Sequence, residues 1–241
     1  MTNNNQQQEF IYNKGYEQSS LVPSIFSFTD LILLGGQVTE RKKDEIDAPT
    51  KLVKRVFDIV FSLTVILLGL PVYLALMAIT KLTSEGPVFY KQERIGEDGK
   101  PFSIIKFRSM RVDAEKSGPQ TTTDNDPRIT KWGNFMRKTH LDEIPQFFNV
   151  LKGDMSIVGP RPERAHFIEQ IQAVAPSYRK LQAVKPGITS IGQVYYGYAE
   201  TVDEMVERMK FDLTYLKEVN IITDIRIIFE TVKVMIQGKG K

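Results

Sequence analysis

Cysteine is absent from this sequence, and histidine occurs only twice, at His140 and His166. The lack of thiols excludes disulfides, thiol chemistry and any cysteine-ligated metal. Two histidines also argue against a zinc site, which usually combines several cysteine or histidine ligands. The sequence has no large excess of either charge. Its net charge of +3 suits an anionic membrane surface but is too small to indicate nucleic-acid binding.

The 241 residues are enough for one sizeable domain with appendages. Residues 1–20 are polar and of low complexity, and they lack the basic start and apolar core of a signal peptide. We therefore expect a disordered tail and a cytoplasmic start. Residues 21–38 are more apolar, but Pro23 and Asp30 interrupt them, so we interpret them as an interfacial or packing segment. Together, residues 1–50 are predicted to form a variable, partly disordered N-terminal extension.

One segment, Ile59–Thr80, is 22 residues long and carries no charge. Its length fits a membrane helix, and a buried core helix is the alternative. Gly69 and Pro71 lie in its middle, and Pro71 has no N–H to donate to the carbonyl of residue 67. Cations lie on both sides, a pattern that favours a hairpin over a single span: Lys51, Lys54, Arg55, Lys81, Lys91 and Arg94. We therefore expect residues 51–85 to form a re-entrant membrane helix that is broken at Gly69 and Pro71.

The remaining sequence alternates helical patterns with short strand patterns, so we predict an α+β fold that is mostly helical with short strands. Two strands are expected at residues 87–92 and 102–107, joined by a turn at residues 96–101. Residues 113–126 are polar and are predicted to form a mobile loop. Residues 188–196 are interpreted as strand-like or irregular. Helices are predicted at four further places: about 131–138, 163–174, 202–219 and 224–237.

Two adjacent carboxylates, Asp142 and Glu143, begin the most informative part of the sequence. Thr139 and Asp142 have the spacing of a capping box, and Pro145 fits the first turn of a helix that ends at Gly153. This places the pair at the positive end of a short helix, which favours ionised carboxylates and attracts phosphate. Helix capping alone would also account for the pair.

The charges around the carboxylate pair favour a ligand site over capping. Arg137, Lys138, Lys152 and Arg161 lie nearby in sequence, although capping requires no cations. Carboxylates among cations suit a divalent metal with a phosphorylated ligand. Prolines on both sides restrict the backbone of Arg161, so less entropy is lost when this residue binds a fixed anion. A surface turn is the alternative interpretation of that arginine.

The stretch LDEIPQFFNVLKGDMSIVGPRP, residues 141–162, resembles the signature of the bacterial sugar transferases. The resemblance covers the chain from about Lys51 to its C-terminus, and as a collinear set the motifs are highly specific. Further pieces that resemble the family flank this stretch in the expected order: KRVFD at 54–58, GPVFYKQERIG at 86–96, FSIIKFRSM at 102–110, KPGITSIGQV at 185–194 and FDLTYLKEVNIITDIRIIFETVKV at 211–234.

Small monotopic phosphoglycosyl transferases of this family move a phosphosugar from a UDP-sugar to polyprenyl (undecaprenyl) phosphate and release UMP. The resemblance implies the first membrane step of glycan assembly, at the bacterial inner membrane. It implies a cytoplasmic catalytic domain formed by residues 86–241, with interfacial helices. A covalent phosphosugar intermediate is expected on Asp142, and Glu143 together with Asp142 is expected to hold Mg²⁺. Contacts with the substrate are assigned to five residues: Lys106, Arg108, Arg137, Gln146 and Arg161.

The same residues are also compatible with different roles. Lys106 and Arg108 would share one face of the second predicted strand, where they could form a solvated edge. The chain could be a membrane-anchored, metal-dependent phosphohydrolase of a lipid diphosphate, or a non-catalytic scaffold for glycan assembly. Expected partners are the UDP-sugar, the polyprenyl phosphate and the lipid bilayer, with a homodimer or glycan-assembly enzymes as further candidates and no nucleic acid. The sugar, the polymer pathway and the role of His140 stay open.

Overall fold

The computed structural model describes residues 46–116, 118–123 and 126–237. The expectations for residues 1–45, including the interfacial segment at 21–38, lie outside these ranges. The described residues belong to one compact unit that is mostly helical and contains two small two-stranded sheets. This confirms the predicted α+β class.

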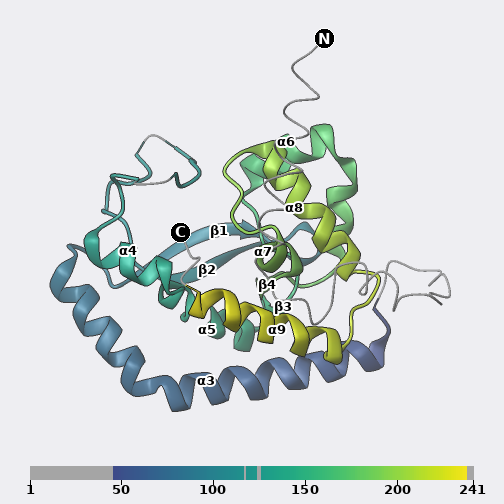
Figure 1. Cartoon of the computed structure of the whole chain (residues 1–241), viewed down its shortest axis with the longest axis horizontal. Coiled ribbons are helices and arrows are strands. Elements are labelled where there is room, and N and C mark those ends of the chain that lie inside the picture. The colour runs from purple at the N-terminus through teal and green to yellow at the C-terminus, as the bar shows by residue number, and fades with distance from the viewer. Residues whose placement is uncertain (1–45, 117, 124–125, 238–241) are drawn as a thin grey trace, which may run out of the picture. The chain divides into compact units, whose positions relative to one another are not determined.

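Helix α3, Ala48–Thr83, is 36 residues long and is one continuous element, so the break predicted at Gly69 and Pro71 does not interrupt it. The helix instead bends partway along its course, as Figure 1 shows. We attribute the bend to Pro71, because its ring clashes with the preceding turn and it lacks the N–H for a helical hydrogen bond. In the part of the chain that the structure describes, α3 is the one helix long and apolar enough to cross a membrane.

Polar contacts attach the N-terminal half of α3 to the rest of the unit. The guanidinium of Arg55 donates to the carbonyl oxygens of Val150, at 2.6 Å, and Leu151, at 2.8 Å. Lys54 forms a buried ion pair with Asp224. An unpaired charge buried there would be costly, so this pairing favours one arrangement of the helix against the unit.

Ring contacts attach the C-terminal half of α3 to the same unit. The ring centroid of Tyr73 lies 5.1 Å from that of Phe107 and 5.8 Å from that of Phe148. The indole N–H of Trp132 donates to the hydroxyl of Thr80 at 3.0 Å. Both halves of α3 therefore contact one unit. Large apolar side chains around the bend are exposed: Leu63, Leu67, Leu68, Leu70, Val72 and Leu74.

Strands β1 (Phe89–Ile95) and β2 (Pro101–Phe107) form an antiparallel hairpin that is closed by the 3₁₀ turn η1 (Glu97–Gly99). This confirms the predicted hairpin, although β1 begins and ends later than expected. Helix α4, Lys131–Lys138, has the predicted bounds. The side chain of Thr130 caps its first turn.

The 3₁₀ turn η2 (Leu141–Glu143) and helix α5 (Gln146–Lys152) follow α4. The predicted capping box is wrong, because Thr139 ends α4 instead of starting the next helix. Its hydroxyl donates to the carbonyl oxygen of Phe135 at 2.9 Å. The predicted end of α5 is confirmed: Gly153 closes the helix in the left-handed region, with φ of 98°.

A parallel sheet, four α-helices and one 3₁₀ helix complete the unit. Strands β3 (Ser156–Val158) and β4 (Gly187–Thr189) pair in parallel, and β3 was not predicted from the sequence. The segment 188–196 contains the end of β4 followed by a helix. The remaining elements are α6 (Ala165–Val174), η3 (Pro176–Ala183), α7 (Ile191–Tyr195), α8 (Val202–Tyr215) and α9 (Ile221–Ile236).

The core fixes α5 against the hairpin. The side chain of Asn149 accepts the N–H of Ile105 at 3.0 Å and donates to the carbonyl oxygen of Ser103 at 2.7 Å. Apolar side chains from β2, α5, β3 and α9 pack into one buried cluster, which includes Ile104, Val150, Met155, Ile157 and Ile227. Since η2 lies next to α5 in the chain, this packing sets where the two adjacent carboxylates stand relative to β2.

Candidate active site

Asp142 and Glu143 lie in η2, between α4 and α5. His140 makes the tight turn into η2: its backbone is left-handed, with φ of 55°, and its carbonyl accepts the N–H of Glu143 at 3.1 Å. This conformation is uncommon for a residue other than glycine and is typical of constrained turns. Asp142 is only 4% exposed. The turn therefore presents the carboxylate pair inside the protein rather than on its surface.

Lys106, in β2, forms an ion pair with Glu143, with 2.5 Å between Nζ and Oε1. Both side chains are largely buried. Burial raises the pKa of Glu143, but the charges of Lys106 and Arg161 outweigh this effect and lower the pKa to about 2. Glu143 is therefore ionised at neutral pH.

The pKa of Asp142 shifts in the opposite direction to that of Glu143. Burial raises its pKa, and the charge of Glu143 adds to this, against the opposing charges of Lys106 and Arg137. A carboxylate with a raised pKa is more basic, and a better nucleophile once ionised, than a carboxylate in water. The site thus combines an ionised glutamate with a more basic aspartate.

The charge of Arg161, in the segment Pro160–Pro162, acts on the carboxylate pair. Burial lowers its pKa, but the carboxylates of Glu143 and Glu163 outweigh burial and raise it, so Arg161 stays charged. Three cations therefore act on the two carboxylates, and five of the predicted site residues come together in the structure: Asp142, Glu143, Lys106, Arg137 and Arg161.

Two residues predicted to bind the substrate are placed differently. Arg108 lies just beyond β2, where its Nε donates to the carbonyl oxygen of Pro87 at 2.8 Å. The structure does not bring it to the carboxylate pair. Gln146 is the first residue of α5 and is 4% exposed. It lies close to the pair in sequence, but its side chain is buried.

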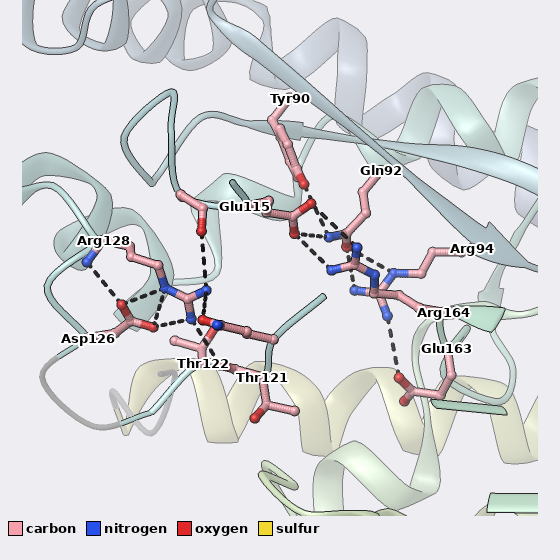
Figure 2. A network of polar contacts seen from close by, with 12 residues as sticks. Tyr90, Gln92, Arg94, Glu115, Thr121, Thr122, Asp126, Arg128, Glu163 and Arg164 are labelled. Atoms are coloured by element: carbon pink, nitrogen blue, oxygen red, sulfur yellow. Dashed lines mark hydrogen bonds and ion pairs between the residues drawn. The ribbon is translucent and has the colours of Figure 1, made fainter. Parts of the chain in front are cut away.

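A polar network around the end of β1, shown in Figure 2, was not predicted from the sequence. Glu163 pairs with Arg94, at 3.4 Å, and with Arg208, at 2.5 Å. Arg94 also donates to the carbonyl oxygen of Pro162 at 3.0 Å. These contacts hold the chain directly after Arg161. In the sequence, the only indication of these contacts is Glu163, the acidic residue that follows Pro162.

Glu115 extends the network to the long loop after β2. Its carboxylate accepts from Gln92 and from Arg164, both at 2.8 Å. Gln92 in turn accepts from Arg94 at 2.6 Å. Figure 2 shows the Glu115 carboxylate pointing toward Gln92 and Arg164. The loop is therefore joined to β1 and to the residues that follow the arginine between the prolines.

The loop has a second anchor at Arg128. Its hydrogen bond to Asp126 lowers the pKa of that carboxyl to about 2. Arg137, beside the carboxylate pair, donates to the hydroxyl of Thr122 at 3.0 Å. Residues 117 and 124–125 lie outside the described ranges, and the predicted mobility of the loop stays a prediction. Its described residues are connected to the site through Arg137.

The carboxylate pair suits only some metals. Within the described ranges, no cluster of three or more aspartate, glutamate, histidine or cysteine side chains could enclose a metal ion. Mg²⁺ does not require such a cage, because it commonly takes one or two carboxylates and completes its shell with water and phosphate oxygens. Glu143 is ionised, and both side chains offer oxygen atoms. The donor set therefore fits Mg²⁺ and not zinc.

A basic, buried aspartate beside an ionised glutamate and three cations is typical of an enzyme that acts on phosphate-bearing substrates. The long apolar helix packed against this site adds a membrane-length element. The chain belongs to the bacterial sugar transferase family, whose model matches residues 49–238. This confirms the resemblance seen in the sequence motifs.

Relatives with named activities are similar over most of this chain. UDP-glucose:undecaprenyl-phosphate glucose-1-phosphate transferase of Escherichia coli (strain K12) is 42% identical over 219 residues, 88% of this chain and 47% of that protein. UDP-N-acetylgalactosamine-undecaprenyl-phosphate N-acetylgalactosaminephosphotransferase of Aeromonas hydrophila is 41% identical over 78% of this chain and 44% of that protein. This chain thus spans about half the length of both. Exopolysaccharide production protein PSS of Rhizobium leguminosarum bv. phaseoli is 40% identical over 78% of this chain and 98% of that protein.

Proposed function

We propose that this chain is a phosphoglycosyl transferase, which moves a phosphosugar from a UDP-sugar to polyprenyl phosphate and releases UMP. The observation that carries the proposal is the buried Asp142 beside ionised Glu143, with Lys106, Arg137 and Arg161 around them. The names of two relatives state a UDP-sugar and undecaprenyl phosphate as their substrates, which supports the same reaction here.

In the first step, a carboxylate oxygen of Asp142 attacks the phosphorus that carries the sugar. The bond between that phosphorus and the bridging oxygen of UMP breaks, and UMP leaves with the bonding electrons. The product is a phosphosugar joined to Asp142. Arg161 and Lys106 are proposed to bind the phosphate oxygens, where fixed cations stabilise the charge that develops in the transition state.

In the second step, a phosphate oxygen of the polyprenyl phosphate attacks the same phosphorus. The bond to Asp142 breaks and the carboxylate is regenerated, so the lipid carries the sugar through a diphosphate. Splitting the transfer in two lets a water-soluble donor and a lipid acceptor use one nucleophile in turn.

Mg²⁺ is the proposed cofactor, with Glu143 and Asp142 as its protein ligands. When bound, it would neutralise charge on the diphosphate and make UMP a better leaving group. Glu143 suits this role because it is ionised at neutral pH. In the structure Glu143 pairs with Lys106. Lys106 would therefore hold the Glu143 carboxylate in place until the donor binds.

We further propose that α3 enters the membrane from the cytoplasmic face of the bacterial inner membrane and returns to it, with the catalytic unit in the cytoplasm. Two observations support this: α3 bends, and both of its halves contact the same unit. A straight helix of 36 residues would be about 54 Å long, against roughly 30 Å of hydrocarbon. The exposed leucines around the bend would then lie in lipid.

UMP release from a panel of UDP-sugars tests the reaction. With undecaprenyl phosphate in lipid nanodiscs, one or a few UDP-sugars should give continuous release of UMP. Without the lipid, release should stop at about one UMP per enzyme, because the first step consumes the nucleophile.

Three results would contradict the proposal. Continuous UMP release without the lipid acceptor would indicate hydrolysis. Cleavage of a lipid diphosphate in the absence of any UDP-sugar would indicate a phosphohydrolase. No release with any UDP-sugar would favour a scaffold.

A further inference from the structure

Glu163, two residues after Arg161, is a buried carboxylate that joins two arginines from distant elements. Its Oε2 pairs with Nη1 of Arg94, near the end of β1, at 3.4 Å. Its Oε1 accepts from Nη2 of Arg208, in α8, at 2.5 Å. Glu163 is 5% exposed, and the side chain of Arg208 is 6% exposed. One carboxylate therefore links β1 and α8 to the segment that carries Arg161.

Strand β1 also binds the backbone directly after the arginine between the prolines. The N–H of Ile95 donates to the carbonyl oxygen of Glu163 at 3.0 Å, and Arg94 donates to the carbonyl oxygen of Pro162 at 3.0 Å. Arg94 is itself oriented, because its Nε and Nη2 donate to the side-chain oxygen of Gln92 at 3.1 and 2.6 Å. A planar guanidinium can reach all three side-chain and backbone acceptors at once, whereas a lysine ammonium lacks this fork.

The parallel sheet holds the residues before Arg161. The N–H of Gly159 donates to the carbonyl oxygen of Thr189 at 3.1 Å, and the carbonyl oxygen of Pro160 accepts the N–H of Gly187 at 3.0 Å. Arg161 itself precedes a proline, which restricts its backbone to extended conformations. Arg161 thus lies between two anchored stretches of backbone, and the stretch that follows it depends on Glu163.

The charges around Glu163 belong to the same arrangement. Arg161, Glu163 and Arg208 line one small cavity. Burial lowers the pKa of Arg161, but the charges of Glu143 and Glu163 raise it. Burial also lowers the pKa of Arg94, where Glu163 opposes the effect of burial and the charge of Arg161 adds to it. Three arginines therefore surround one carboxylate, and without it their like charges would repel one another.

We propose that Glu163 is a positioning residue for Arg161. By pairing with Arg94 and Arg208, it fixes the backbone after Arg161 and so holds the guanidinium of that arginine ready for the diphosphate of the donor. The role of the diphosphate rests on the proposed function, whereas the contacts of Glu163 rest on geometry alone. Glu163 acts only through Arg161. An ionised carboxylate is needed, because a neutral amide would leave two buried guanidinium groups without a counter-charge.

Hydrogen exchange at the amide of Ile95 tests the attachment directly in the full chain. This N–H donates to the carbonyl oxygen of Glu163, so its protection reports whether β1 holds that residue. Glu163→Gln preserves size and removes the charge. The amide of Ile95 should exchange about tenfold faster in the variant, whereas the amide of Ile105, which donates to Asn149 at 3.0 Å, should be unchanged. Equal protection of Ile95 in both proteins would overturn the proposal, as would equal losses at Ile95 and Ile105.

Kinetics test whether Glu163 acts through Arg161. Glu163→Gln should raise the KM for the UDP-sugar about tenfold and leave the KM for the lipid unchanged. In an Arg161→Ala background the same change should add little, since the group being positioned is gone. A full, additive effect in that background would overturn the proposal. If the native protein releases no UMP with any donor, the proposed function fails, and amide exchange at Ile95 still decides the attachment.

Arg94→Lys is the second variant, and it keeps the proposal testable if Glu163→Gln does not fold. It preserves the positive charge but loses the fork that reaches Gln92, Pro162 and Glu163 together. We expect faster exchange at the Ile95 amide and a higher KM for the UDP-sugar, with the KM for the lipid unchanged. Native values of both quantities in this variant would overturn the proposal.

Asp224→Asn is the matched control in another part of the core. Asp224 is a buried carboxylate, 1% exposed, that pairs with Lys54 and accepts from the hydroxyl of Tyr215 at 2.7 Å. We expect a lower Tm with no change in the exchange of the Ile95 amide or in the KM for the donor. If Asp224→Asn and Glu163→Gln change these two quantities equally, general destabilisation accounts for the effect and the positioning role is wrong.

Discussion

Arg55 donates to the carbonyl oxygen of Val150 at 2.6 Å, and this bond joins the membrane-length helix to the last turn of α5. Carbonyls at a helix C-terminus lack partners within the helix and carry partial negative charge, so a cation stabilises them. The other end of α5 begins shortly after Glu143. One short helix thus lies between the contact with α3 and the carboxylate pair.

Replacing Arg55 by Met should therefore weaken both stability and catalysis. Two charge-assisted hydrogen bonds, to Val150 and Leu151, are lost and their carbonyls stay partly buried. We expect the free energy of unfolding to fall by about 1.5–3 kcal/mol. The turnover rate should fall several-fold, measured as UMP release. The exposed Lys51, one turn earlier, is the control, and equal losses in Lys51→Met would contradict a specific role for Arg55.

If Asp142 is the nucleophile, as proposed, then Asp142→Asn should form no covalent adduct with a UDP-sugar. Shape is kept and the attacking carboxylate is lost, so turnover should drop by orders of magnitude while the protein stays folded. Intact-protein mass spectrometry detects the adduct, and circular dichroism checks folding. Asp98→Asn, at an exposed turn, should behave like the native protein. A well-folded Asp142→Asn protein with near-native turnover would show that Asp142 is not the nucleophile.

The proposed metal predicts that a chelator stops turnover and that added Mg²⁺ restores it without refolding. Glu143→Gln should raise the Mg²⁺ concentration needed for half-maximal activity, because a neutral amide is a weaker ligand. The measurement is initial rate against free Mg²⁺ for both proteins. Full activity of the native protein in excess chelator would contradict the metal role.

The residues of the proposed active site were easier to predict from the sequence than the residues that hold them. Asp142, Glu143 and Arg161 were predicted because their charges lie close together in one motif. The ion pair between Glu143 and Lys106 also depended on the hairpin, which was predicted although β1 is shifted along the chain. In these cases local patterns carried the information.

The supporting contacts depend on tertiary structure. Arg208 lies on α8, 45 positions after its partner Glu163, and nothing in its own helix marks it as a partner of that residue. Thr139 has the right spacing for an N-cap, but the carbonyl of Phe135 in the preceding helix takes its hydroxyl instead. Arg108 was expected to share a strand face with Lys106, yet β2 ends before it and its side chain donates to the carbonyl of Pro87. In each case a distant or competing partner decided the outcome.

Acid should weaken the loop after β2 through Asp126. Its pKa in the folded protein is about 2, because Arg128 favours the ionised form, against an ordinary value near 4 in the unfolded chain. A lowered folded-state pKa means that this stabilisation is present above about pH 4 and is lost as the pH falls through 2. Asp126→Asn should therefore be less stable by about 1–2 kcal/mol at pH 7 and should depend less on acid. Urea unfolding at pH 7 and pH 3 measures the free energy of unfolding of the native protein and of the variant. If this free energy changes between the two pH values by the same amount in both proteins, the role of Asp126 is contradicted.

The bend of α3 leads to a prediction about topology. If Pro71 causes the bend, Pro71→Leu should favour a straighter helix, which is long enough to cross the membrane. Some molecules should then place the chain before α3 on the far side. The measurement uses single cysteines, which this cysteine-free chain permits. They are introduced at Asn13 and at the exposed Lys100, and are labelled with an impermeant reagent in intact cells.

In the native sequence both cysteines should be protected, because a re-entrant helix keeps both ends in the cytoplasm. In Pro71→Leu, the cysteine at Asn13 should become labelled in a fraction of molecules, while the cysteine at Lys100 stays protected with the catalytic unit. Val72→Leu, which changes the next residue without changing the backbone, should match the native protein. Labelling at Asn13 but not at Lys100 in the native sequence would show that α3 spans the membrane. The contacts of Arg55 and Trp132 with one and the same unit would then have to break on insertion.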